Sequence, residues 1–223
     1  MSRLTWALAL CAGALLLAPC PAVAQPASPG RVDVAAGVRW FGPLDFGRVD
    51  AAESTLAGGS RPLFSADSTL DASAGVSALV SVRVASGLRA EGAVSYNPTG
   101  LSVRITGDPE VSDRTTISAP VGQFLIEGGV LREIRRRGRL VPFAAAGAGY
   151  LRQLNDGRTL IETGTSFYGG GGLYYVRESA RPRRVKASGV RLDVRAEFLR
   201  GGVAPDRTTR LVPAVTAVFF ARF

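Results

Sequence analysis

The sequence predicts an all-β fold, an antiparallel up-and-down transmembrane β-barrel of about eight strands, with long extracellular loops and mostly short periplasmic turns. Three observations support this. Apolar and polar residues alternate along most of the chain, which is the period of a β-strand with one apolar face. After residue 24 no uninterrupted apolar run approaches the ~18 residues of a spanning helix. The chain ends on an apolar face whose last member is Phe223.

The first 24 residues have the pattern of a secretory signal peptide. Arg3 supplies a positive start, an apolar stretch runs from Leu4 to Ala18, and Ala22-Val23-Ala24 is a small-x-small cleavage site. We therefore expect residues 1–24 to be removed and residues 25–223 to form the barrel. An N-terminal membrane anchor is the alternative, although the apolar run is short for the roughly 20 residues of a spanning helix. A lipoprotein site at Cys20 is a further alternative, which the preceding proline disfavours.

The first strand of the mature chain shows the alternation most clearly. Over residues 32–40 the even positions are apolar, from Val32 to Trp40, and the odd positions include Asp33 and Arg39. Nine residues with this pattern match the roughly 9–11 that a tilted strand needs to cross a bilayer. We expect further strands at residues 70–84, 88–96, 117–134, 140–152, 167–177, 190–198 and 211–223.

The connections between these strands alternate in length. Long segments at residues 42–66, 107–114, 153–166 and 200–208 are expected to be extracellular loops, and residues 85–87, 135–139 and 178–187 to be periplasmic turns. An even number of strands places both chain ends in the periplasm. Ten strands are the alternative to eight.

A soluble β-sandwich would also alternate, but it would face its charges to water. Here the polar faces carry small residues with scattered Arg and Glu, as a narrow lumen requires. Aromatic residues gather near predicted strand ends, as in the girdles of membrane barrels. We assign to the outer girdle Trp40, Tyr96, Tyr150, Phe167, Tyr168 and Phe198, and to the inner girdle Phe143, Tyr174, Tyr175, Phe219 and Phe223.

Three segments resemble the small outer-membrane β-barrel family of the OmpA/OmpX type. They are Leu140–Tyr150, with its Pro-aromatic and Gly-x-Gly-aromatic pattern, Gly189–Arg195, and the ending Phe219-Phe220-Ala221-Arg222-Phe223. The resemblance covers the layout of the mature chain and about 25 residues of motif. It implies residence in the cell outer membrane. It also implies an assembly signal at Phe219 and Phe223 that the barrel-assembly machinery reads.

The composition argues against an enzyme. The chain contains no histidine, and both cysteines precede residue 25, so His-based nucleophiles, thiol catalysis and His or Cys metal sites are excluded. The enzymes of the outer-membrane barrel class resemble one another in relying on histidine. We expect no catalytic residue, no metal and no cofactor. The formal charge of +9 comes with no nucleic-acid motif, so we expect no nucleic-acid partner.

Eight ionisable residues are expected to face the lumen as a polar network. They are Arg39, Arg83, Arg89, Glu91, Glu127, Asp193, Arg195 and Glu197. An eight-stranded barrel is just wide enough to be filled by side chains. These residues therefore form a paired plug that closes the lumen, or alternatively line a gated polar path for small solutes.

The sequence thus favours a non-enzymatic barrel, monomeric in outer-membrane lipid, with a structural or loop-mediated role in the cell envelope. The long first loop, with Asp45, Phe46, Arg48, Asp50 and Glu53, is its expected contact surface. The alternatives are a narrow porin-like channel and a soluble periplasmic ligand-binding barrel. Two basic clusters, at residues 132–139 and 181–186, are either solvated turn charges or contacts to lipid phosphates.

Overall fold

The part of the chain that the structure describes forms ten antiparallel strands in one sheet. The computed structural model describes residues 31–54, 59–107, 115–134, 138–155, 160–179, 184–203 and 208–223. The expected signal peptide, the second outer loop at residues 108–114, and parts of the two basic clusters lie outside these residues. The strands are β1 (Val32–Phe41), β2 (Leu44–Ser54), β3 (Ser60–Leu70), β4 (Ser73–Ala85), β5 (Leu88–Thr106), β6 (Thr115–Glu133), β7 (Leu140–Asn155), β8 (Leu160–Glu178), β9 (Ala187–Gly201) and β10 (Thr209–Arg222).

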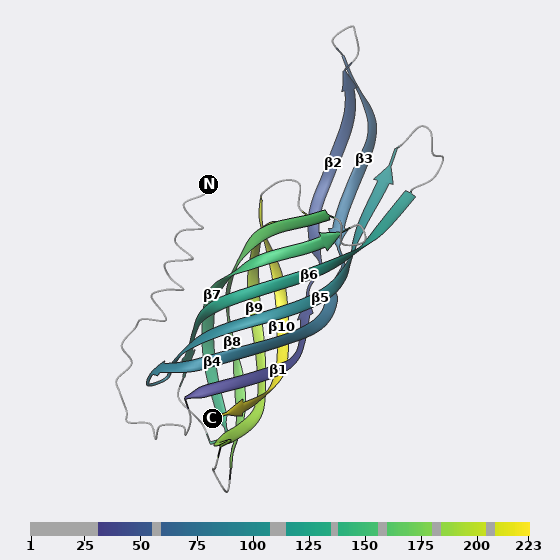
Figure 1. The fold of residues 1–223 in the computed structure, drawn as a ribbon. Helices are drawn as coiled ribbons and strands as arrows, with labels where there is room; N and C mark the ends of the chain where they lie inside the picture. The colour runs from purple at the N-terminus through teal and green to yellow at the C-terminus, as the bar shows by residue number, and fades with distance from the viewer. Residues whose placement is uncertain are drawn as a thin grey trace.

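Eight of these strands close into a ring (Figure 1). The order around it is β1, β4, β5, β6, β7, β8, β9 and β10, and β10 pairs with β1 to complete the circle. Every pairing is antiparallel, and each strand after β4 pairs with the next one in sequence. The predicted up-and-down barrel of eight strands is confirmed. The ten strands of the sheet include two, β2 and β3, that lie outside the ring.

The two chain ends meet at one end of the barrel, which we call the terminal end. The amide of Phe223 donates to the carbonyl oxygen of Val32 (2.8 Å), and the amide of Arg31 donates to the carbonyl oxygen of Phe223 (2.7 Å). These bonds extend the β1–β10 seam to the last residue. The opposite end, from which β2 and β3 project, is called the hairpin end.

The first predicted loop is wrong in its structure, because most of residues 42–66 form strand. β2 and β3 are a hairpin in which Val49 pairs with Ala66. β3 then continues the sheet alongside the outer part of β5, where Leu70 pairs with Leu101. The third outer loop is also shorter than expected, because β7 reaches Asn155 and β8 begins at Leu160.

Asp71 forms the corner where the chain passes from the hairpin into the barrel. The Asp71 amide donates to the carbonyl oxygen of Gly100 (2.8 Å), and Thr99 Oγ1 donates to the carbonyl oxygen of Asp71 (2.6 Å). β5 can therefore pair with β4 in its first half and with β3 in its second half. Residues 42–66 look like a loop in the sequence, but pairing with distant residues of β5 places most of this segment in strands.

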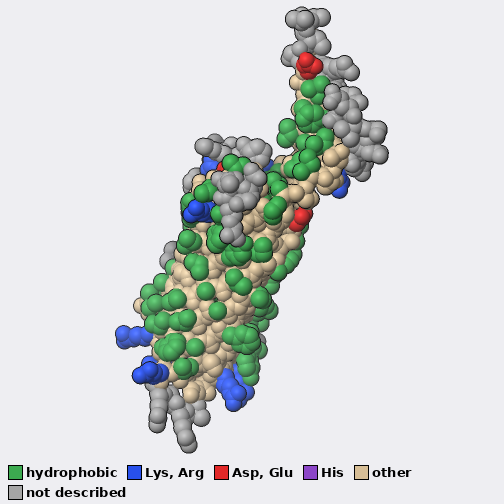
Figure 2. All heavy atoms as spheres, turned by 45° about the vertical axis from the view of Figure 1, so that its right-hand side comes forward, with side chains coloured by type: hydrophobic (Ala, Val, Ile, Leu, Met, Phe, Trp, Pro, Cys, Tyr) green, Lys and Arg blue, Asp and Glu red, His purple; other side chains and the backbone are tan. Residues whose placement is uncertain are grey.

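The sides of the barrel wall have the polarity that the alternation predicts. Val38 and Phe219 point outward and are 60% and 74% exposed, whereas Arg89 and Arg191 are 0% exposed. Figure 2 shows apolar side chains spread over the barrel exterior and basic side chains at the terminal end. Leu79, the one break in the predicted alternation of its strand, faces inward and is buried.

The aromatic girdles are only partly as predicted. Trp40, Tyr150, Phe167 and Phe198 are exposed toward the hairpin end, and Tyr175, Phe219 and Phe223 toward the terminal end. The assignments of Tyr168, Phe143 and Tyr174 to the girdles are wrong, because all three side chains are buried in the lumen. Successive side chains of a strand point to opposite faces, and each of these three residues lies an odd number of positions from the outward-facing residues of its strand.

Within the described ranges, no helix is long and apolar enough to span a membrane.

Candidate functional site in the barrel lumen

The lumen holds a connected set of charged side chains. Seven of the eight predicted residues are buried there and joined in ion pairs: Arg39, Arg89, Glu91, Glu127, Asp193, Arg195 and Glu197. The eighth, Arg83, lies half-buried at the terminal end. Alternate positions on adjacent strands bring these residues together, because odd-numbered residues of β1, β5, β6 and β9 all face inward.

A central chain of ion pairs runs along the lumen. Arg191 Nη2 contacts Asp193 Oδ2 (2.6 Å), and Arg195 Nη2 contacts the same oxygen (2.8 Å). Arg195 Nη1 also lies 3.5 Å from Glu127 Oε2. With Glu91 included, Arg191 joins two carboxylates and Arg195 joins three, so removal of either arginine breaks several contacts at once.

Arg39 ends this chain toward the hairpin end. Its Nη1 contacts Glu127 Oε2 (2.6 Å) and its Nη2 contacts Glu197 Oε1 (2.5 Å). Nη1 also lies 3.4 Å from Ser95 Oγ. One guanidinium thus holds two buried carboxylates from two different strands.

Glu91 extends this series of ion pairs across the full width of the barrel. It lies on β5, four places around the ring from β9, which is the greatest separation that eight strands allow. Its Oε1 accepts from Arg195 Nη2 (3.0 Å) and from Arg191 Nη2 (3.1 Å), and its Oε2 pairs with Arg191 Nη1. Side chains from opposite walls are therefore in direct contact.

A second group of charges fills the lumen nearer the terminal end. Asp33 receives both Arg222 Nε and Arg222 Nη2 at 2.8 Å, and its Oδ1 also lies 2.8 Å from Arg89 Nη2. Glu133 Oε1 lies 3.7 Å from both arginines. A bidentate Arg–carboxylate pair with a second arginine satisfies most of the carboxylate's acceptor capacity.

The predicted set missed Asp33, Glu133, Arg191 and Arg222. Asp33 and Arg191 have the same parity as Arg39 and Asp193, so strand alternation alone would have included them. Among the described residues the fully buried charges balance. They are the five arginines Arg39, Arg89, Arg191, Arg195 and Arg222 and the five carboxylates Asp33, Glu91, Glu127, Asp193 and Glu197. An unpaired ion in this setting would cost several kcal/mol, which explains the balance.

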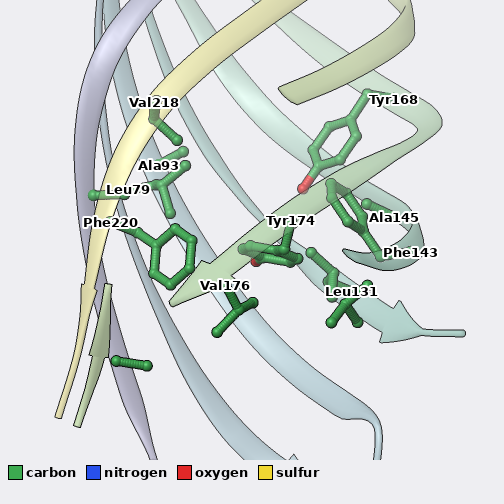
Figure 3. Close-up of a cluster of buried hydrophobic side chains, with 13 residues drawn as sticks. Leu79, Ala93, Leu131, Phe143, Ala145, Tyr168, Tyr174, Val176, Val218 and Phe220 are labelled. Atoms are coloured by element: carbon green, nitrogen blue, oxygen red, sulfur yellow. The ribbon is translucent and has the colours of Figure 1, made fainter. Parts of the chain in front are cut away.

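Aromatic rings pack against the arginines. Figure 3 shows Tyr174 near the middle of the buried apolar cluster, and its ring centroid lies 5.0 Å from that of Phe143 and 5.3 Å from that of Phe220. The Arg191 guanidinium carbon lies 4.6 Å from the Phe143 ring centroid, and that of Arg195 lies 4.3 Å from the Tyr168 centroid. These contacts stabilise the arginines through cation–π attraction and fill space between them.

Apolar side chains pack together near the hairpin end of the lumen, and we call them the mouth cluster. Its buried members are Phe41, Leu44, Leu70, Val121, Leu125, Leu151, Leu199, Val212 and Ala214. Beneath it Gln153 Nε2 donates to Gln123 Oε1 (2.9 Å), and Asn97 Nδ2 donates to the carbonyl oxygen of Arg39 (3.0 Å). The lumen is therefore polar in its middle and apolar at its outer mouth.

Beyond the mouth the polarity of the sheet reverses. The extension consists of β2, β3 and the outer ends of β5 and β6. Side chains on one face include the exposed apolar residues Val49, Phe64 and Ile117. This face continues the inward face of the barrel, because Val49 lies in the same row as Ala66 and Ile105.

The opposite face of the extension is polar. Arg48 Nη2 donates to Ser65 Oγ (2.6 Å), and Ser65 Oγ donates to Asp50 Oδ1 (2.6 Å). The Ser65 hydroxyl and then the Arg48 guanidinium hold the pKa of Asp50 below its ordinary value. Because these residues continue the lipid-facing side of the wall, the change in polarity marks where the wall leaves the apolar medium.

The root of the hairpin is fixed to the barrel by Arg210 of β10. Arg210 Nε and Nη2 donate to the carbonyl oxygens of Asp45 and Phe46 (both 3.1 Å), and its guanidinium lies over the Phe46 ring. Phe46 packs partly buried against the mouth cluster. It therefore does not belong to the exposed contact surface that we expected.

The described residues contain no group of three or more His, Cys, Asp or Glu side chains that could hold a metal ion. The acids of the lumen are instead neutralised by arginine. What the arrangement can do chemically is hold opposite walls together and occupy the path between the two ends.

Comparisons with known proteins agree on the fold. The sequence matches no family model, and no curated protein is a significant match. The structure is similar to that of the outer membrane protein OprG from Pseudomonas aeruginosa, with 13% identity over 87% of this chain and 96% of that one, at a TM-score of 0.54. It is also similar to Neisserial surface protein A (NspA), with 13% identity over 89% of this chain and 100% of that one, at a TM-score of 0.52.

The fold and the surface are those of a small integral outer-membrane β-barrel. At this level of identity the likeness is one of fold, and it confirms the architecture that the three sequence segments implied. A bilayer requires an apolar exterior, and the charges of this barrel lie paired inside it. In a closed barrel every backbone group is also hydrogen-bonded within the wall.

Proposed function

We propose that this protein is a non-enzymatic outer-membrane barrel with a closed lumen, which supports the envelope and presents its extension for contacts outside the cell. The observation that carries the proposal is the contact of Glu91 with Arg191 and Arg195 across the whole width of the ring. The ion pairs that span the lumen and the mouth cluster above them support a closed lumen rather than a continuous polar path.

The extension is the part of the molecule available for contacts. It projects past the barrel on β2, β3 and the ends of β5 and β6 (Figure 1). Its apolar face exposes Val49, Phe64 and Ile117, and large exposed apolar groups outside the bilayer are typical of interaction surfaces. We therefore propose that the contact surface of this segment is its apolar face, and not the charged residues that the sequence suggested.

We also propose how the protein is located and assembled, and that it catalyses no reaction. The absence of histidine from the sequence supports a non-enzymatic role. The apolar exterior supports residence in outer-membrane lipid. We further propose that the terminal end faces the periplasm and that the protein is a monomer. Assembly by the barrel-assembly machinery is expected from the alternating apolar ending at Phe219 and Phe223.

Single-channel recording in planar bilayers tests the closed lumen. We expect the purified wild-type protein to insert without a steady open conductance. The double variant Glu91→Ala/Arg195→Ala removes one charge of each sign from the crossing point and keeps the net charge, so we expect opening events in that variant. A steady, appreciable conductance of the wild-type protein would contradict the closed lumen and favour a narrow channel.

A further inference from the structure

A groove lies on the lipid-facing side of the barrel at its terminal end. It has a volume of about 300 Å³ and is lined by residues of β8, β9 and β10, among them Tyr175, Arg177, Ser188, Val190 and Phe219. Of these residues, the proposed function uses only Phe219, as part of the expected assembly signal. We call this feature the terminal groove.

The walls of the terminal groove are apolar toward the middle of the membrane. Tyr175 pairs with Val190, and Val190 pairs with Phe219, so the three side chains form one row across adjacent strands. They are 44%, 38% and 74% exposed. An acyl chain lying along this row would bury apolar surface that the protein leaves open.

The next row toward the terminal end is polar and small. Arg177 pairs with Ser188, and Ser188 pairs with Ala221. Because Ser188 and Ala221 are short, the floor drops between the Arg177 side and the large side chains of the first row. An arginine at the level where apolar residues give way to basic ones is placed for a headgroup.

A second arginine completes the polar end. Arg139 Nη1 lies 3.3 Å from the Tyr175 hydroxyl, to which it donates. Arg139 and Arg177 are both exposed. Glu178 follows Arg177 but lies on the other face of β8, since neighbouring residues of a strand alternate. Two cations, a phenol and a hydroxyl therefore border the apolar row.

We propose that the terminal groove binds one anionic phospholipid of the periplasmic leaflet. Its acyl chain lies against Tyr175, Val190 and Phe219, and its phosphate is held by Arg139 and Arg177, with the Ser188 hydroxyl as a further donor. Charge complementarity selects this occupant, because a phosphate is the anion present at headgroup depth, where arginine binds it with paired N–H donors.

Quenching by brominated lipids measures binding at this groove. The reporter is the full chain with Phe219→Trp, in which Trp6 and Trp40 are changed to Phe, reconstituted in phosphatidylcholine with increasing brominated phosphatidylglycerol. A parallel titration uses brominated phosphatidylcholine. We expect brominated phosphatidylglycerol to be preferred at the reporter by roughly thirtyfold, from about 1 kcal/mol for each of two arginines at a membrane surface. In the reporter with Arg139→Gln/Arg177→Gln the preference should fall to about onefold.

A matched control removes two exposed arginines from the other end. The reporter with Arg152→Gln/Arg200→Gln loses the same net charge and should keep the preference. If the glutamine pair at the groove fails to fold, as judged by heat-modifiable migration, Arg139→Lys/Arg177→Lys keeps the charge and should retain most of the preference.

Three results would overturn the proposal: no preference in the parent reporter, an undiminished preference in the groove variant, or equal losses in the groove variant and the control. Inorganic phosphate at millimolar concentration distinguishes a free anion from a lipid. We expect it to leave the quenching unchanged, and full displacement would show a soluble-anion site instead.

Discussion

Arg39 joins two buried carboxylates in the half of the charged lumen nearer the hairpin end. It is 2% exposed and holds the carboxylates of Glu127 and Glu197, at 2.6 and 2.5 Å. A buried ion pair adds little net stability, but loss of one partner leaves an uncompensated charge. The arginines of the lumen therefore matter chiefly for what their removal exposes.

We predict that Arg39→Ala lowers the free energy of unfolding by about 3–5 kcal/mol, because buried Glu197 loses the arginine that it contacts and Glu127 keeps only its longer contact with Arg195 Nη1 (3.5 Å). Urea unfolding in lipid vesicles, followed by tryptophan fluorescence, measures the change. The outward-facing Arg152 provides the comparison, and Arg152→Ala should change stability by no more than ~0.5 kcal/mol. Similar values for the two variants would contradict the network.

Gly147 and Gly129 allow the Tyr168 hydroxyl to lie between β6 and β7. The two glycines pair with each other, and a Cβ on either would clash with that hydroxyl. We predict that Gly147→Ala costs about 1–3 kcal/mol through overpacking. The neighbouring Gly128 is the control, because a Cβ added there would meet no atom within 4 Å. Gly128→Ala should therefore be nearly neutral in the same unfolding measurement, and equal costs would show that the close approach to Tyr168 is unimportant.

At the scale of the element, the β1–β10 seam closes the barrel with the last residue of the chain. Phe223 contributes backbone bonds to Val32 and Arg31 and an exposed ring. The backbone hydrogen bonds of Phe223 stabilise the folded barrel, whereas its ring is part of the expected assembly signal. The two roles can be separated by experiment.

We predict that Phe223→Ala refolds in detergent micelles like the wild-type protein but accumulates several-fold less in the outer membrane of cells. Deletion of Phe223 should lower both, since it removes the backbone bonds as well. Heat-modifiable migration follows refolding, and immunoblots of membrane fractions follow assembly. Normal assembly of both variants would argue against a targeting role.

The hairpin is an addition to a ring that closes without it. β1 pairs with β4 from Val32 to Phe41, so the hairpin between them carries none of the ring's pairing. We predict that replacing residues 48–67 with an Asn-Gly turn leaves a folded barrel, with stability changed by roughly 1 kcal/mol or less. Leu70→Ala, in the mouth cluster, should cost about 2–5 kcal/mol in the same assay. A truncated chain that fails to fold would make the hairpin part of the folding unit.

The strands of the ring could be predicted from sequence because each presents one face to an apolar medium. Alternation located β1 and β9 to within a few residues. It could not reveal β2 and β3, because outside the membrane neither face needs to be uniformly apolar, and the strand conformation there depends on pairing with β5. Leu79 looked like an irregularity because it is an apolar residue at one of the odd, inward-facing positions of β4. The lumen accepts apolar side chains where they pack on one another.

At the scale of the whole molecule, parity predicts which charges face inward but not which of them meet. Contacts such as Arg191 with Glu91 join strands at opposite sides of the ring. They depend on strand tilt and on side-chain length, which no local pattern encodes. Tyr174 shows the same limit, because a tyrosine near a strand end fits a girdle or a lumen equally well until the strand register is known.

An apolar outside and a charged inside make this chain an integral membrane barrel. The most direct measurement is the migration of unheated protein on a gel after the outer-membrane fraction has been washed with alkaline carbonate. We expect the protein to remain in the washed membrane and to run at a lower apparent mass before heating than after it. Release into the wash, or identical migration before and after heating, would contradict an integral, closed-ring barrel.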